Sequence, residues 1–152
     1  MSVNAATRPK LLIPSLSGFY AVAPKLGYLL VRVTVGAILF IHGWAKVKGG
    51  VAHEVGFFVQ HGFPQPALCA YTIMFFETIG SIGVILGLFT RFFAAGLAID
   101  LGVAFLAIHF PHGFSASHGG YEYVLLLGMV MFAIALRGGG PLSLDRAIGV
   151  EL

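Results

Sequence analysis

The chain has 152 residues, of which 58% are apolar and only 10% are charged, and its mean hydropathy is +0.93. A soluble domain of this length carries about a quarter charged residues, so this much apolar surface cannot be enclosed in one aqueous core. One domain in a lipid bilayer is therefore expected. The net charge of +3 rests on too few charges for a nucleic-acid-binding face and indicates membrane topology instead.

Four apolar stretches are long enough to cross a bilayer, which takes about 20 residues in a helix. Only Thr90 and Arg91 separate the second from the third, which predicts a tight antiparallel hairpin. Pro111 ends the third stretch, because the residue before a proline is pushed out of the helical region. The expected fold class is an all-α integral membrane protein, a bundle of four transmembrane helices with spans at about 26–45, 66–89, 92–110 and 119–136.

The regions outside the spans indicate the orientation. Residues 1–25 are expected to form an N-terminal cytoplasmic or interfacial segment, residues 26–136 the membrane domain, and residues 137–152 a C-terminal cytoplasmic tail. Four spans place both termini on one side of the membrane, and the positive-inside rule makes that side the cytoplasm. The basic residues of that side are Arg8, Lys10, Lys25, Arg91, Arg137 and Arg146, against Lys46 and Lys48 on the other.

Two further patterns concern packing. The loop at 47–65 contains Phe57 and Phe58 among glycine and polar residues, which suits either an interfacial helix over the mouth of the bundle or a solvated loop. Gly83 and Gly87 form a pair of small residues that lets helices approach closely. Gly80 and Ser81 lie one turn after Glu77, so Glu77 is expected to face a neighbouring helix and not lipid.

Ionisable side chains occur in every predicted span, although a charge at a helix centre costs about 2.5–3.5 kcal/mol even on the lenient insertion scale. The rise of about 1.5 Å per residue divides them into two layers. The central layer comprises Arg32, Glu77 and Asp100, and the outer layer comprises His42, His109 and Glu122.

The central layer suggests an ion pair, in which Arg32 lies beside one or both carboxylates because its planar fork can serve two acceptors. One arginine cannot neutralise every carboxylate, so at least one carboxyl is expected to be protonated or to face water. Both a proton-handling core and a purely structural polar network fit this pattern.

The outer layer suits a quinone headgroup, whose carbonyls need donors and whose reduction needs protons. Interfacial residues that reach headgroup water are the alternative. Neither a metal site nor a haem is expected, because no close ligand spacing such as His-x-x-x-His occurs, and no covalently bound cofactor is expected. Asp100 and His109 are nine residues apart, which places them on opposite faces of a regular helix, so they can point at one centre only if the helix ends or bends near His109.

Several strings are more specific than their single residues. They are His42-Gly-Trp-Ala-Lys46, Gly62-Phe-Pro-Gln-Pro66, Glu77-Thr-Ile-Gly80, Gly87-Leu-Phe-Thr-Arg91, Gly119-Gly-Tyr-Glu-Tyr123 and Gly140-Pro-Leu-Ser-Leu-Asp145. In order and spacing these strings resemble the DoxX family of small bacterial four-helix membrane proteins, over residues 26–147.

The resemblance implies a multi-pass protein of the bacterial inner membrane that works with partner subunits and contacts lipid. The family takes its name from a subunit linked to quinone-dependent thiosulfate oxidation, so respiratory or sulfur metabolism is implied. Ser143 and Asp145 also fit a simpler role, in which they end one helix and cap the next. The recurring polar positions of the family fall on His42, Lys46, Glu77, Arg91, Glu122, Ser143 and Asp145.

Three functions therefore compete. The first is a membrane subunit of a quinone-linked oxidoreductase, with its polar site of His42, His109 and Glu122 at the outer end of the bundle. The second is a non-catalytic anchor or accessory subunit of a larger membrane complex, and the third is a small transporter or ion-handling protein. A complete enzyme is not expected, because the chain is too small for separate cofactor domains and has no glycine-rich nucleotide motif after a strand.

Overall fold

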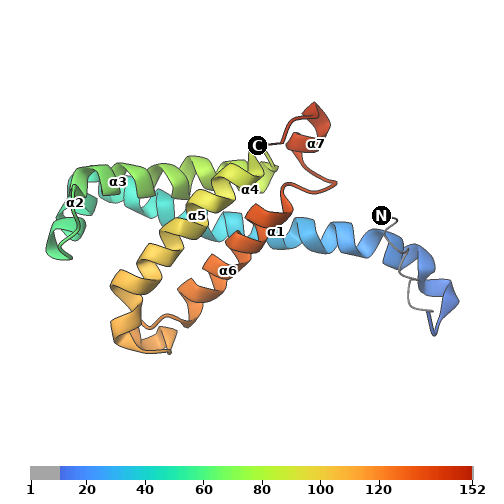
Figure 1. Cartoon of the computed structure of the whole chain (residues 1–152), viewed down its shortest axis with the longest axis horizontal. Coiled ribbons are helices and arrows are strands. Elements are labelled where there is room, and N and C mark those ends of the chain that lie inside the picture. Colours follow the sequence, from blue (N-terminus) through green and yellow to red (C-terminus); the bar gives the residue numbers. More distant parts are fainter. Residues whose placement is uncertain (1–10, 152) are drawn as a thin grey trace, which may run out of the picture.

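The computed structural model describes residues 11–151, and every regular element in this part of the chain is a helix, with no strand (Figure 1). Its main elements form two antiparallel hairpins. Helix α1 (Ser17–Gly49) leads through α2 (Val51–Gln60) into a second, broken helix made of α3 (Pro66–Phe75), η2 (Phe76–Gly80) and α4 (Ser81–Leu86). Helix α5 (Thr90–Ala104), extended by η3 (Phe105–His109), then pairs with α6 (Glu122–Arg137). The last helix is α7 (Leu144–Ile148). The short 3-10 turns are η1 (Pro14–Leu16), η4 (Phe110–His112) and η5 (Ala116–His118).

The all-α membrane class is confirmed, and three of the described helices are long and apolar enough to cross a bilayer. They are Pro14–Gly49, Pro66–Leu86 and Thr90–His112. Helix α6 has 16 residues, which at about 1.5 Å each amount to roughly 24 Å. It is apolar but shorter than the other three, so the fourth span and the cytoplasmic termini remain predictions.

Helix α1 is longer than the sequence pattern indicated. It begins at Ser17 instead of near residue 26 and continues through Pro24 without a break in the helix. Its 33 residues correspond to about 50 Å, against a hydrocarbon core of about 30 Å. Its N-terminal part therefore projects beyond the other helices, as Figure 1 shows. The predicted interfacial segment at 1–25 is thus helical from Ser17 onward, while residues 1–10 lie outside the described part.

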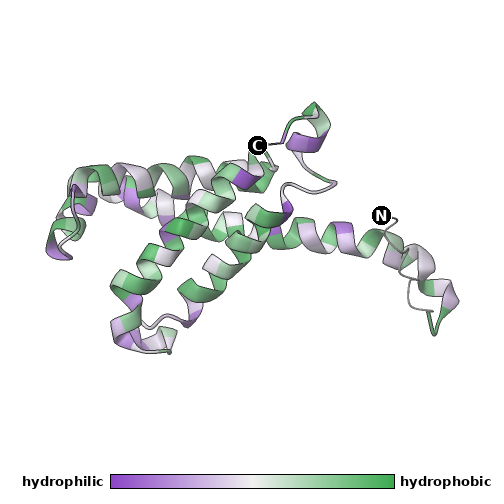
Figure 2. Ribbon diagram, in the orientation of Figure 1, coloured by the Kyte–Doolittle hydropathy of each residue, from purple (hydrophilic) through white to green (hydrophobic). Residues whose placement is uncertain are grey.

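The two hairpins cross obliquely and share one core. In Figure 1 the α5–α6 hairpin runs diagonally to α1 and α3–α4. The core joins Val35 and Leu39 of α1 to Val84 of α4, and these to the α5–α6 side chains Leu97, Leu101, Val124, Leu127, Met131 and Ile134. Outside this core, large apolar side chains face outward, among them Leu30, Ile41 and Ile99, and Figure 2 shows long apolar stretches on the helices with polar colour concentrated at α2, α7 and the helix ends. This is the pattern of a protein whose solvent is lipid.

Close helix contacts depend on glycine. A side chain at Gly43 of α1 would overlap the backbone of Glu77, and one at Gly36 would meet Ile85. On α5, Gly96 leaves room for the ring of Phe76. Small residues permit such approach where lipid supplies no hydrophobic drive between helices. The prediction that Glu77 faces a neighbouring helix is confirmed, since Glu77 is buried against α1.

The predicted hairpin between the second and third apolar helices is also confirmed. Helix α4 ends at Gly87, which has a positive φ of 72°, and α5 begins after Phe89, whose φ is 47°. A positive φ is unfavourable for phenylalanine. The Asp145 carboxylate holds this turn by accepting hydrogen bonds from the backbone N–H groups of Phe89, at 2.6 Å, and Thr90, at 3.0 Å. The tail thus fixes the geometry of a turn more than 50 residues earlier in the chain.

Candidate functional site

A cavity of about 390 Å³ lies between the two hairpins, at the end of the bundle where α2 and the loop before α6 are found. Most of its wall is apolar, from residues such as Leu39, Phe58 and Leu127. Ligand sites typically combine such a wall with a few converging polar groups. Here the ionisable groups are His42 and Lys46 of α1, Glu54 of α2, Glu77 of η2, Asp100 of α5 and His109 of η3.

Glu77 is placed by a break in the second helix. Its segment η2 is a single π-helical turn between α3 and α4, and such turns are frequent at functional sites. Gly43 brings α1 against the backbone at Glu77, and one turn later Lys46 Nζ donates a hydrogen bond to Glu77 Oε2. The Glu77 side chain is 7% exposed and that of Lys46 is 23% exposed, so this ion pair is largely removed from solvent.

Asp100 and His109 line the same cavity, although a regular helix would put them on opposite faces. The reason is η3, a second π-helical turn that follows α5 and ends at His109. A π turn makes i→i+5 hydrogen bonds and so shifts the phase of the residues that follow it. The sequence allowed the two residues to share a centre only if the helix ended or bent near His109, and η3 is such an irregularity.

The cavity carries more carboxyl groups than cations. Glu54, Glu77 and Asp100 are acidic, and Lys46 is the lysine or arginine on the wall. Glu77 is paired with Lys46, whereas within residues 11–151 no hydrogen bond is formed by the side chains of Glu54 or Asp100. Two carboxyl groups are thus left to face the cavity, where a ligand or a water molecule can meet them.

The predicted pairing of Arg32 with Glu77 and Asp100 is wrong. Arg32 is 1% exposed, and its guanidinium donates to backbone carbonyls of the C-terminal tail: that of Gly139, and that of Leu142 at 2.7 Å. A weaker bond reaches Ile85 O at 3.5 Å. These neutral carbonyl acceptors draw Arg32 away from the cavity, so the polar core is divided between two places.

A second polar cluster surrounds Arg32, and we call it the C-terminal clamp. It consists of Arg32, Thr90, Arg91 and Asp145 with the backbone of residues 138–142. Asp145 is 3% exposed and accepts from Thr90 Oγ1 at 2.6 Å in addition to the two N–H groups of the turn. Arg91 donates to the carbonyls of Ala135 and Leu136 at the end of α6. The clamp thus ties α1, the α4–α5 turn and the tail together.

The third outer residue, Glu122, has a different place from His42 and His109. Its Oε1 accepts from the N–H of Ala116 at 2.7 Å, and Glu122 is not among the cavity-lining residues, whereas its neighbour Tyr123 is. His109 Nδ1 lies 2.7 Å from the carbonyl oxygen of Gly119. A carbonyl oxygen only accepts, so Nδ1 carries the hydrogen, and Nε2 is the ring nitrogen left for a ligand.

Sequence reasoning did not single out Glu54. Its signal was the spacing of Glu54 and Phe58, which on a helix fall on one face, and both are buried on α2 facing the cavity. Of the two alternatives for this loop, the helix is the one formed. Ser143 accepts from Arg146 N at 3.2 Å and caps α7, as the simpler interpretation of the tail predicted.

These two clusters can be compared with known proteins. The DoxX family model matches residues 27–110 of the chain. The chain belongs to the DoxX family. A Bacillus subtilis protein named "Putative oxidoreductase CatD" is 34% identical over 121 residues, which span 80% of this chain and 86% of that relative. The Escherichia coli "Inner membrane protein YphA" is 30% identical over 134 residues, 84% of this chain and 94% of the relative. No solved structure matches.

Most of the polar positions that the resemblance singled out fall into two groups in this structure, and Glu122 belongs to neither. His42, Lys46 and Glu77 face the cavity, while Arg91 and Asp145 belong to the C-terminal clamp. Among the described residues, no group of three or more His, Cys, Asp or Glu side chains has an arrangement that could hold a metal ion.

Proposed function

We propose that this DoxX-family chain is a membrane subunit of a quinone-linked oxidoreductase, located in the bacterial inner membrane, and that the cavity receives the quinone headgroup. The observation that carries the proposal is the convergence of His42, Lys46, Asp100 and His109 on one mostly apolar cavity of about 390 Å³. A volume in the range of roughly 300–1,000 Å³ is usual for small-molecule sites.

The chemistry of the wall suits a quinone in both redox states. Lys46 and His42 can donate hydrogen bonds to the two carbonyl oxygens of a quinone, and His109 Nε2 can accept one from a quinol hydroxyl. The apolar side chains Leu39 and Phe58 suit the ring face. Position in the fold also supports the proposal, because a lipid-soluble ligand can reach a cavity between two membrane hairpins without crossing water.

Reduction of a quinone to a quinol takes two electrons and two protons. The electrons would come from a partner dehydrogenase subunit, and the protons could pass through carboxyl groups of the cavity. Asp100 and Glu54 are suited to this role because their side chains have no hydrogen bond within residues 11–151, whereas Glu77 is engaged by Lys46. Asp100 is the nearer candidate to the membrane interior, since it lies within α5.

One observation favours the second function, an accessory subunit without a reaction of its own. The C-terminal clamp is a buried polar cluster in which protein groups accept from the terminal guanidinium nitrogens of Arg32 and donate to Asp145, while Arg32 Nε has no partner among the described residues. A subunit made only of such clusters would serve assembly. The cavity distinguishes the two functions, because assembly alone does not require carboxyl groups without hydrogen-bond partners.

A cavity-filling variant tests the proposal directly. Ala104 lines the cavity, and Ala133 is an exposed alanine of α6 outside it, so Ala104→Phe and Ala133→Phe form a matched pair. In nanodiscs, short-chain benzoquinone and naphthoquinone should bind to the parent chain and to A133F, and at least ten-fold more weakly to A104F.

His42→Gln should weaken the same binding, and in native membranes it should lower quinone-dependent turnover of the assembled complex. Normal turnover and equal quinone affinity in A104F and H42Q, with melting temperatures like that of the parent, would exclude the cavity as the quinone site and leave the accessory function.

A further inference from the structure

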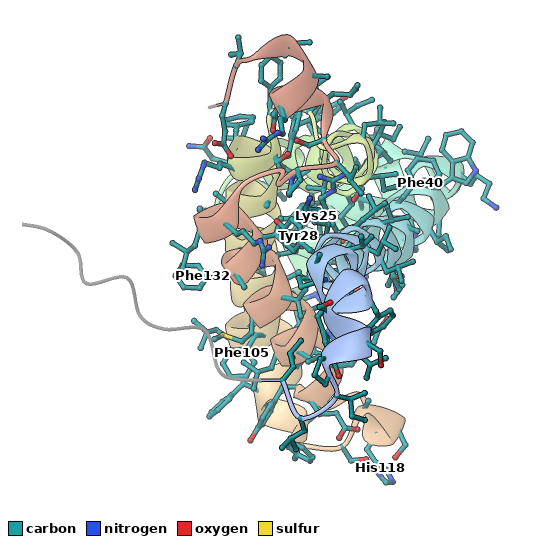
Figure 3. All side chains as sticks on the ribbon, turned by 90° about the vertical axis from the view of Figure 1, so that its right-hand side faces the viewer. Lys25, Tyr28, Phe40, Phe105, His118 and Phe132 are labelled. Carbon is teal, nitrogen blue, oxygen red and sulfur yellow. The ribbon has the colours of Figure 1, made fainter. Side chains whose placement is uncertain are left out.

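A second, separate hollow lies on the outer face of the α5–α6 hairpin. It is an apolar groove of about 680 Å³, with Gly102 and Gly128 at its floor and Phe105 and Phe132 among its walls. Figure 3 shows Phe105 and Phe132 on the same side of the molecule, away from Phe40 of α1. The groove shares only Leu101 and Val124 with the lining of the cavity, and these buried side chains form the partition between the two.

The groove has the length of a lipid chain. It extends from Arg91 of α5 to Phe105, the first residue of η3, and at about 1.5 Å per residue these 14 steps make roughly 21 Å. Half of the hydrocarbon core is about 15 Å thick. An acyl chain that begins at the Arg91 end can therefore occupy the groove from the membrane surface to the midplane.

The Arg91 end of the groove is basic. Leu136 lines the groove, and Arg137, the next residue, lines an adjoining polar hollow of about 430 Å³ together with Arg146. The two acidic residues of this hollow are already engaged: Asp145 by the α4–α5 turn, and Glu151 by Arg91 Nε at 3.2 Å. Among residues 11–151, neither Arg137 nor Arg146 forms an ion pair. The Arg137 guanidinium lies over the Tyr28 ring, 4.1 Å from its centroid, and a stacked guanidinium keeps its N–H groups free at the edge for a phosphate.

From this charge distribution we propose that the groove binds one acyl chain of an anionic phospholipid whose phosphate lies against Arg137 and Arg146. Guanidinium groups bind phosphate through paired N–H donors, and basic residues at the membrane surface favour anionic lipids. A second copy of the chain is a poorer occupant, because a symmetric dimer of parallel subunits through this groove would bring the same arginines together. The proposal does not depend on the quinone function.

The groove offers a matched pair of variants. A side chain added at Gly102 meets no atom within 4 Å, and the same is true at Gly27 of α1, which lies outside the groove. Gly102→Leu should therefore fill the groove without disturbing the packing, and Gly27→Leu is the control with the same change in a helix. Arg137→Gln combined with Arg146→Gln removes the charge and keeps hydrogen-bonding capacity.

Native mass spectrometry of the full chain provides the measurement. The chain is equilibrated with equal amounts of phosphatidylglycerol and phosphatidylethanolamine of matched acyl chains. The parent and G27L should each retain one phosphatidylglycerol, with a preference of at least five-fold. G102L should lose retention of both lipids, and the double arginine variant should lose the preference.

Three results would overturn the proposal. They are equal retention of the two lipids by the parent, full retention of phosphatidylglycerol by G102L, and a dimer that G102L disrupts. None of these lipid results would alter the quinone affinity of the cavity, so the lipid proposal and the quinone proposal can be tested independently.

Discussion

The cavity and the C-terminal clamp both contain acidic and basic side chains, but these differ in how many hydrogen-bond partners they have. In the clamp, Arg32 and Asp145 are buried, and protein groups bond to both Asp145 oxygens and to both terminal nitrogens of Arg32, which leaves only Arg32 Nε without a partner from residues 11–151. In the cavity, Asp100 and Glu54 face open space without a hydrogen bond from residues 11–151. Buried polar groups are normally satisfied, and exceptions call for an explanation. The comparison teaches that a charge in a membrane span is a guide to function only after its partners are known.

The largest effect is expected at Arg32. In Arg32→Met the carbonyls of Gly139 and Leu142 lose a buried charged donor, and hydrogen bonds to charged groups contribute about 1.5–3 kcal/mol each. We expect the free energy of unfolding in mixed micelles to fall by about 3 kcal/mol or more. Arg146→Met, at an exposed position, is the control and should stay within about 0.5 kcal/mol. Equal stability of both variants would show that the Arg32 hydrogen bonds of the clamp do not stabilise the fold.

The next effect is expected at Asp145. Asp145→Asn replaces one of two acceptor oxygens by a donor, which then faces the N–H of Phe89 if it takes the place of Oδ1 or the N–H of Thr90 if it takes the place of Oδ2. Leaving such a group unsatisfied costs about 1–3 kcal/mol, so a loss of about 2 kcal/mol is expected, measured by the same unfolding assay. Glu151→Gln serves as its counterpart, since the exposed pair with Arg91 is expected to contribute less than about 1 kcal/mol.

Asp100→Asn should behave in the opposite way. Because no described residue bonds to this carboxyl group, its removal should leave the melting temperature unchanged or raise it slightly. Quinone-dependent turnover of the assembled complex should fall at least ten-fold, because asparagine cannot carry a proton. A lower melting temperature with full turnover would show that Asp100 belongs with the clamp residues and not with a reactive site.

The smallest effect is expected at Glu122. Glu122→Gln keeps an oxygen that can accept from Ala116 N, so the free energy of unfolding should change by less than about 1 kcal/mol. Quinone affinity should stay within two-fold of the parent, because Tyr123 and not Glu122 lines the cavity. A ten-fold loss of affinity would return Glu122 to the quinone site that the sequence suggested.

Hydropathy and turn residues were sufficient to predict the apolar helices and the hairpin at Thr90 and Arg91, because both depend on local composition. The partners of Arg32 could not be predicted. Its acceptor Gly139 is 107 residues away and contributes a backbone carbonyl, which leaves no mark in the side-chain pattern. The shared cavity of Asp100 and His109 was expected only on condition of a bend near His109, and that bend could not be predicted, since a period of 3.6 residues does not hold through a π-helical turn.

The two π-helical turns, η2 and η3, affect how the sequences of homologues align with this chain. Each turn accommodates one residue more than an α-helix does over the same length. A homologue with straight spans would therefore differ from this chain by a one-residue gap inside an apolar helix, near Glu77 or just before His109. Such a gap would mark the loss of a π-helical turn that orients an ionisable side chain toward the cavity. An alignment of the family would therefore identify the members in which this arrangement of the cavity is absent.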